Sequence, residues 1–248
     1  MRGWEIGRIG GVPLEVPPNF LLWTVFLWWS LQYGFPRSHI GFPENTYRLL
    51  AIGATFLVVG AILLHEIVTL RAQKMTGGVL PRRVILGPLG GWHRTDSAST
   101  EPAAIRAEIL ASFCGPAAYM AMAIGCMGTG LSLQPLLPDF LPTRAVIDTV
   151  AIACSSLAFL NLLPGAPLDG GRILAAAVRR VKGDADRGIA AARTGGLMIG
   201  AWLCALGVMA LWLMGTMWAF WGIILGVAIL DGVGIVAPSS PELRDEIA

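Results

Sequence analysis

A run of 37 residues without a charged side chain, from Thr194 to Leu230, constrains this chain more than any other feature. As one helix the run would be roughly 55 Å long, whereas the hydrocarbon core of a bilayer is about 30 Å thick. We therefore expect the run to break near Met214-Gly215-Thr216 into two membrane spans, at residues 194–213 and 217–236.

Four further apolar runs are long enough to cross a bilayer, at residues 20–35, 49–70, 109–133 and 149–168. Charged residues make up only 14% of the 248-residue chain, whereas soluble proteins have about 25%, and hydrophobic residues make up 55%. The surface of a soluble protein cannot be built from so few charges. The expected fold is an all-α integral membrane protein with about six transmembrane helices, in a single membrane domain of residues 1–248.

The positive charges indicate how these spans are oriented. With six spans, all but three of the 18 lysines and arginines lie on one side of the membrane, and the exceptions are Arg37, Arg48 and Arg144. Because positively charged loops stay in the cytoplasm, both termini are expected to be cytoplasmic. The interspersed charges form no basic patch with aromatic residues, so no nucleic-acid partner is expected. The lipid bilayer is the expected surrounding.

The loop between the second and third spans contains the apolar segment Val84-Ile85-Leu86, between Pro81 and Pro88. Apolar residues bounded by prolines and glycines are typical of a short strand, so a β-hairpin at the membrane surface is one expectation. An irregular loop that is held down by its apolar residues is the alternative. The chain has no internal repeat, which argues against the small transporter that is a third functional alternative.

Two segments near the ends of spans carry polar residues that suggest chemistry. His65-Glu66 is the first half of the motif H-E-x-x-H, in which two histidines on one helix face bind zinc and the glutamate takes a proton from water. Position i+4 holds Thr69. Without the second histidine, a histidine and glutamate that reach toward the membrane interface are an equally simple interpretation.

The second segment runs from Asn161 to Arg172 and contains Asp169 between two prolines and a glycine pair. Prolines and glycines interrupt a helix, and a broken helix end inside a membrane lines a polar cavity. Asp169 is therefore a candidate oxygen ligand for a metal that a histidine of another span also holds. Alternatively, Asp169 simply begins the next loop.

Together these segments resemble the site-2 protease family of intramembrane zinc metalloproteases, in its bacterial six-span branch without an appended regulatory domain. The segment N-L-L-P-G-A-P-L-D-G-G-R-I-L, which begins at Asn161, fits the family pattern over its whole length. Shorter matches are Gly10-Gly11-Val12-Pro13, Leu86-Gly87-Pro88-Leu89-Gly90-Gly91, Glu108-Ile109-Leu110-Ala111 and Gly115-Pro116. The resemblance extends from about Gly7 to Gly232.

The resemblance implies a Zn²⁺ ion held by His65, by the second histidine of the motif and by Asp169, with Glu66 as the general base. Asn161 would help to bind the carbonyl of the peptide bond. The substrate would be a membrane-spanning protein whose helix unwinds and pairs with the strand near Val84. The location would be a bacterial plasma membrane.

This chain departs from the family at a metal ligand. Thr69 replaces the second histidine, and a neutral hydroxyl is a poor zinc ligand compared with imidazole. His93 is a possible substitute ligand on the same side of the membrane, and Tyr119 stands where the family often has asparagine. Two functions therefore stay open. One is a membrane zinc metallopeptidase, and the other is a catalytically impaired pseudoprotease that binds membrane-protein segments without cleaving them.

Overall fold

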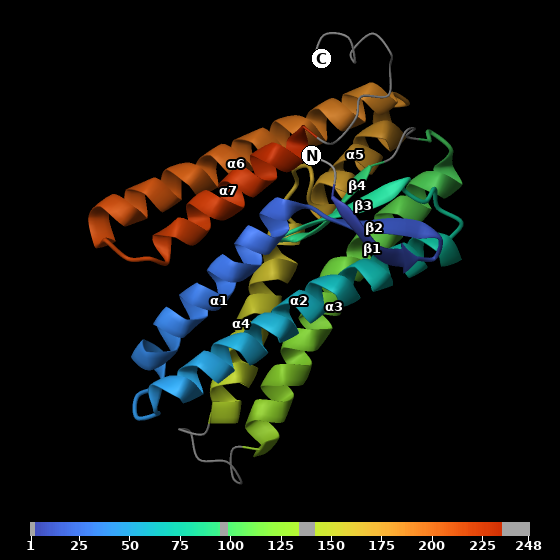
Figure 1. Ribbon diagram of the computed structural model, residues 1–248. Helices are drawn as coiled ribbons and strands as arrows, with labels where there is room; N and C mark the ends of the chain where they lie inside the picture. The colour runs from blue at the N-terminus through green and yellow to red at the C-terminus, as the bar shows by residue number, and fades with distance from the viewer. Residues whose placement is uncertain (1–2, 95–98, 134–141, 235–248) are drawn as a thin grey trace.

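The computed structural model describes residues 3–94, 99–133 and 142–234. These residues contain two β-hairpins and seven helices (Figure 1). The elements in chain order are β1 (Trp4–Ile9), β2 (Val12–Val16), α1 (Pro18–Ser38), α2 (Glu44–Met75), β3 (Arg83–Gly87), β4 (Gly90–Arg94), α3 (Pro102–Leu133), α4 (Pro142–Asn161), α5 (Asp169–Lys182), α6 (Ala185–Met214) and α7 (Ala219–Val233).

The four strands form one sheet in the order β1-β2-β3-β4. The two hairpin pairs are antiparallel, whereas β2 and β3 are parallel, with Leu14 opposite Val84. The fold is therefore mostly helical rather than all-α. Because β3 has a neighbour on each side, the strand that contains Val84 has no free edge. A substrate strand cannot pair with it as the sequence analysis expected.

The N-terminal hairpin is the part of the sheet that the sequence analysis missed. Gly10 and Gly11 both have positive φ, at 61° and 95°, which glycine adopts without a steric penalty in a tight turn. The side chains of Val12, Leu14 and Val16 are buried, so β2 alternates between buried and partly exposed residues. That alternation was visible in the sequence, and its partner strand was not.

Within residues 3–94, 99–133 and 142–234, four helices are long and apolar enough to cross a membrane, namely α2, α3, α4 and α6. The chain is a multi-pass membrane protein. The other two predicted spans correspond to α1 and to α7, which has only 15 residues. Helix α6 ends at Met214, and Gly215 follows with a φ of 59°, so the long charge-free run breaks where it was expected to break.

The predicted span 149–168 lies too far along the chain, because α4 begins at Pro142 and ends at Asn161. Proline has no backbone N–H and its ring clashes with the preceding turn, so Pro164 and Pro167 do not continue the helix. A new helix, α5, begins at Asp169 in a region that the sequence analysis treated as a loop. The interruption places Asp169 at the start of a helix.

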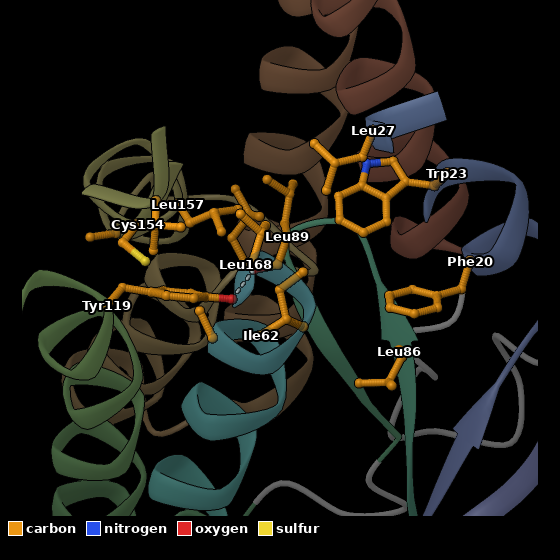
Figure 2. Packing of buried hydrophobic residues seen from close by; sticks show 14 of the residues in the cluster. Phe20, Trp23, Leu27, Ile62, Leu86, Leu89, Tyr119, Cys154, Leu157 and Leu168 are labelled. Carbon is orange, nitrogen blue, oxygen red and sulfur yellow. Dashed lines mark hydrogen bonds between the residues drawn. The ribbon is translucent and has the colours of Figure 1, made fainter. Parts of the chain in front are cut away.

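Helix α2 lies at the centre of the helical part and packs against α1, α3 and α4. Figure 2 shows buried side chains from several elements converging near its middle. Ile62 of α2 and Tyr119 of α3 lie close to Leu168, which precedes α5, and to Leu89 of the turn between β3 and β4. This packing brings the β3–β4 turn against the polar residues of α2.

Candidate metallopeptidase centre

Helix α2 carries three buried polar residues at successive turns of one face. His65 and Thr69 are four residues apart and therefore lie one above the other, and Gln73 follows at the same spacing. All three side chains are buried, and so is Glu66. A row of buried polar residues in a membrane helix is costly unless each residue has a polar partner.

Asp169 meets His65 across the interface between α5 and α2. His65 Nε2 lies 2.9 Å from Asp169 Oδ2, although the two residues are 104 positions apart in the chain. Asp169 stands in the first turn of α5, where the helix dipole favours a negative charge. Arg172 donates from Nη1 to the other oxygen of Asp169 at 3.3 Å and from Nη2 to Gln73 Oε1 at 3.2 Å. Arg172 thus ties Asp169 to α2.

Glu66 accepts hydrogen bonds on both carboxylate oxygens. Its Oε1 lies 2.9 Å from His65 Nδ1 and accepts the Gly91 backbone N–H at 2.5 Å. Its Oε2 lies 2.9 Å from His93 Nε2. A carboxylate with three donors is held in one orientation. The structure therefore brings His93 into the centre as a partner of Glu66.

Thr69 has no comparable partner. Its Oγ1 is buried and has no hydrogen-bond partner among the described residues. Gly115 of α3 lies directly opposite, because a Cβ atom built there would be 2.3 Å from His65 Nε2 and 2.5 Å from Thr69 Oγ1. Only glycine fits at this point of α3. His65 Nε2 and Thr69 Oγ1 therefore face the same small region beside Gly115.

Tyr119 and Asn161 line the other side of the centre. The Tyr119 ring stacks on His65, with ring centroids 4.4 Å apart and planes 17° apart. Tyr119 donates its hydroxyl to the Leu89 carbonyl at 3.3 Å (Figure 2). Asn161 Nδ2 donates to the same carbonyl at 2.6 Å and to the Leu157 carbonyl at 3.0 Å. Tyr119 thus contributes both a stacking contact and a hydrogen bond.

Sequence reasoning missed Arg172 and Gln73 as parts of the centre. A signal for each was present in the sequence. Gln73 continues the four-residue spacing of His65 and Thr69, and Arg172 stands three residues after Asp169, the spacing that pairs side chains on a helix. Their contact across 99 positions depends on how α2 and α5 pack.

Part of this centre lies in a segment that matches a known protein family. Residues 140–206, which include Asn161 and Asp169, match the model of Peptidase family M50. Two relatives are named as zinc metalloproteases. Rip3 of Mycobacterium tuberculosis is 31% identical over 208 residues, which are 82% of this chain and 50% of the relative. The protein sll0528 of Synechocystis sp. is 29% identical over 235 residues, which are 93% of this chain and 58% of the relative.

The fold has a match as well. The solved structure of the site-2 protease from Methanocaldococcus jannaschii superposes with a TM-score of 0.66 at 19% identity, over 96% of this chain and 95% of that chain. The chain therefore resembles the site-2 proteases in its match to Peptidase family M50 over residues 140–206, in its relatives and in its fold. It spans about half the length of the curated relatives that it matches.

A hydrolytic zinc site uses three protein ligands and leaves a fourth position for water. His65 Nε2 and Asp169 Oδ2, an imidazole nitrogen and a carboxylate oxygen, lie within hydrogen-bond distance of each other at 2.9 Å and are both atom types that bind zinc. The third donor near them is the Thr69 hydroxyl, which has no hydrogen-bond partner among the described residues. The donor set fits a divalent cation with two strong ligands and one weak one.

The third histidine or carboxylate that would complete a strong site is missing from the described part of the chain. Among these residues, no group of three or more His, Cys, Asp and Glu side chains is arranged to hold a metal ion. His93 contacts Glu66 through Nε2, and its Nδ1 is buried without a hydrogen-bond partner among the described residues. His93 thus stands beside the expected base.

Proposed function

We propose that the chain is a membrane metallopeptidase that hydrolyses peptide bonds within or at the membrane. The observation that carries the proposal is the meeting of His65 and Asp169 from two distant segments, 2.9 Å apart and next to Glu66. Such a buried cluster of a histidine and two carboxylates in a membrane helix bundle is hard to explain by stability alone, because each ionisable group is costly there. The resemblance to the site-2 proteases indicates the same reaction class.

His65 and Asp169 would hold the zinc ion, with the Thr69 hydroxyl in the third position. When bound, zinc polarises a carbonyl group and makes a nearby water more acidic. Glu66 would accept the proton of that water, while His93 keeps its carboxylate in place. Asn161, which already donates to a backbone carbonyl, would bind the carbonyl of the substrate.

The substrate would be a membrane-spanning protein, because the centre lies among helices that are themselves long and apolar enough to cross the bilayer. We further propose six spans, formed by α1, α2, α3, α4, α6 and α7, in one membrane domain of residues 1–248. Both termini would lie in the cytoplasm of a bacterial cell, with the chain in the plasma membrane. The distribution of lysine and arginine supports this orientation.

A second candidate is a pseudoprotease that binds membrane-protein segments without cleaving them. The specific observation in its favour is Thr69. Its hydroxyl stands at the position of a zinc histidine, is neutral, and binds zinc more weakly than imidazole. Losing a direct ligand should cost more than the roughly 10- to 100-fold loss that follows from removing a residue behind a ligand.

The zinc content of the purified, detergent-solubilised chain tests the proposal, with Asp169→Ala as the control. About one zinc per chain, lost in Asp169→Ala, supports the metallopeptidase and justifies a search for substrates. No zinc in the parent chain together with about one zinc in Thr69→His supports the pseudoprotease. If neither Asp169→Ala nor Thr69→His changes the zinc content per chain, the centre does not bind metal as proposed.

A further inference from the structure

The turn between β3 and β4 lies against the centre rather than at the surface. Leu89 is only 2% exposed. A Cβ atom at Gly90 would lie 3.2 Å from Glu66 Oε1 and 3.3 Å from His65 Cε1, and one at Gly91 would lie 2.6 Å from the Glu66 carboxylate. The two glycines therefore let a stretch of backbone lie directly against His65 and Glu66.

This stretch of backbone is bound at both of its polar ends. The Leu89 carbonyl accepts hydrogen bonds from Asn161 of α4 and from Tyr119 of α3. Two residues later, the Gly91 N–H donates to Glu66 of α2. Three side chains from three helices thus hold one short segment, with two donors for its carbonyl and one acceptor for its N–H.

Gly90 and Gly91 are the first two residues of strand β4, and Leu89 directly precedes them. In a strand, the carbonyl of one residue and the N–H of the residue two positions later point to the same side. Any extended segment offers this pair of groups, whatever its side chains. The three contacts use backbone groups that any peptide has. The one special requirement is that the second and third residues, Gly90 and Gly91, are small.

We infer that Tyr119, Asn161 and Glu66 form a binding site for an extended peptide backbone beside His65 and Asp169, and that the Leu89–Gly91 turn occupies this site until a client segment displaces it. The inference rests on the proposed function, in its cleaving or its non-cleaving form. The preferred client segment resembles the turn: a large apolar residue followed by two glycines. Larger residues at the last two positions would meet Glu66 and His65 as a Cβ atom at Gly90 or Gly91 does.

The test separates the turn from the site that it occupies. Gly91→Ala pushes the turn away, because the new Cβ would be 2.2 Å from Val84 Cγ1 and 2.6 Å from Glu66 Cδ, while Tyr119 and Asn161 are unchanged. Gly7→Ala is the matched control, since a Cβ atom at Gly7 of the same sheet meets nothing within 4 Å. The probe is a short fluorescein-labelled apolar peptide with Leu-Gly-Gly at its centre, measured by anisotropy in detergent with the protein kept in chelator.

Gly91→Ala should bind the probe about tenfold more tightly than the parent chain, the factor that corresponds to one or two hydrogen bonds of the turn that no longer compete. Gly7→Ala should bind it as the parent does. Adding Tyr119→Phe to Gly91→Ala should weaken binding about fivefold. A probe with Leu-Val-Val in place of Leu-Gly-Gly should bind at least tenfold more weakly to every variant.

Hydrogen exchange on the parent chain keeps the inference testable if Gly91→Ala does not fold. Saturating probe should speed exchange of the Leu89–Gly91 amides, because the turn leaves, whereas a ligand that binds elsewhere slows exchange or leaves it unchanged. Probe binding without faster exchange at the turn overturns the inference, as does a folded Gly91→Ala variant that binds no better. These readouts need neither zinc nor cleavage, so they stay interpretable if the metallopeptidase proposal fails.

Discussion

The two halves of the centre differ in how completely their polar groups are paired. Around His65 and Asp169, both imidazole nitrogens and both Asp169 oxygens have partners, and Arg172 links the group back to Gln73. Around Thr69 and Gly115, the threonine hydroxyl has no partner among the described residues. The first half is a preorganised network, whereas the second contains a buried hydroxyl that this network does not include.

The two halves meet at Gly115 of α3. A Cβ atom at Gly115 would touch both Thr69 and His65. The close approach of α3 to α2 therefore depends on this glycine. Changes in either half should reveal whether the two still act as one site.

The largest effect is expected for Asp169→Ala, in the fully paired half. Removing the carboxylate leaves His65 Nε2 and Arg172 Nη1 without their partner in a buried site. The free energy of unfolding in detergent should fall by about 3 kcal/mol, which thermal unfolding can measure. Asp148→Ala is the control, because Asp148 lies in a more exposed pair with Arg144 and should change stability by less than about 1 kcal/mol. Equal effects would mean that the His65–Asp169 contact contributes nothing.

Gly115→Ala should lower the free energy of unfolding by about 2 kcal/mol, because the methyl group would clash with His65 and Thr69 in a packed interface. It should also remove whatever zinc the parent chain binds. Gly125→Ala on the same helix meets nothing within 4 Å and should leave stability and zinc unchanged. A stable Gly115→Ala variant with full zinc content would show that the metal does not bind between these residues.

His93→Ala tests whether the histidine is a substitute ligand or a partner of Glu66. If His93 only holds Glu66, the substitution should lower the free energy of unfolding by about 1 kcal/mol, because Glu66 Oε2 loses its partner. The zinc content should then not change. Loss of zinc in this variant, with no gain from Thr69→His, would instead make His93 a ligand. His39→Ala, a histidine outside the centre, is the control for both measurements.

The smallest effect is expected for Arg172→Lys. The guanidinium uses two different nitrogens for Asp169 and Gln73, whereas an ammonium is a single point donor. The free energy of unfolding should fall by about 0.5–1 kcal/mol. The exposed Arg180 on the same helix provides the control Arg180→Lys, which should be neutral within the error of a thermal melt. A neutral Arg172→Lys would mean that one of the two contacts is dispensable.

Much of this could be predicted from sequence where the signal is local. The charge-free run, the break at Gly215, the His65-Glu66 pair and the segment around Asp169 are all read from neighbouring residues. The parallel pairing of β2 with β3 could not be predicted, because it joins residues about 70 positions apart through backbone groups that every residue has. Helix α5 was missed for a local reason, because two prolines precede it and its first turn, Asp169-Gly170-Gly171, has the composition of a loop.

The sequence by itself determined that this is a membrane protein that resembles the site-2 proteases, because hydropathy and a long contiguous motif depend only on the order of residues. It also determined that a threonine stands where a zinc histidine is expected. Only the tertiary structure decided what that threonine faces, which residue holds Glu66, and that Leu89 binds Tyr119 and Asn161. Those contacts arise from helix packing and from close backbone approach, which depend on elements that are far apart in the chain.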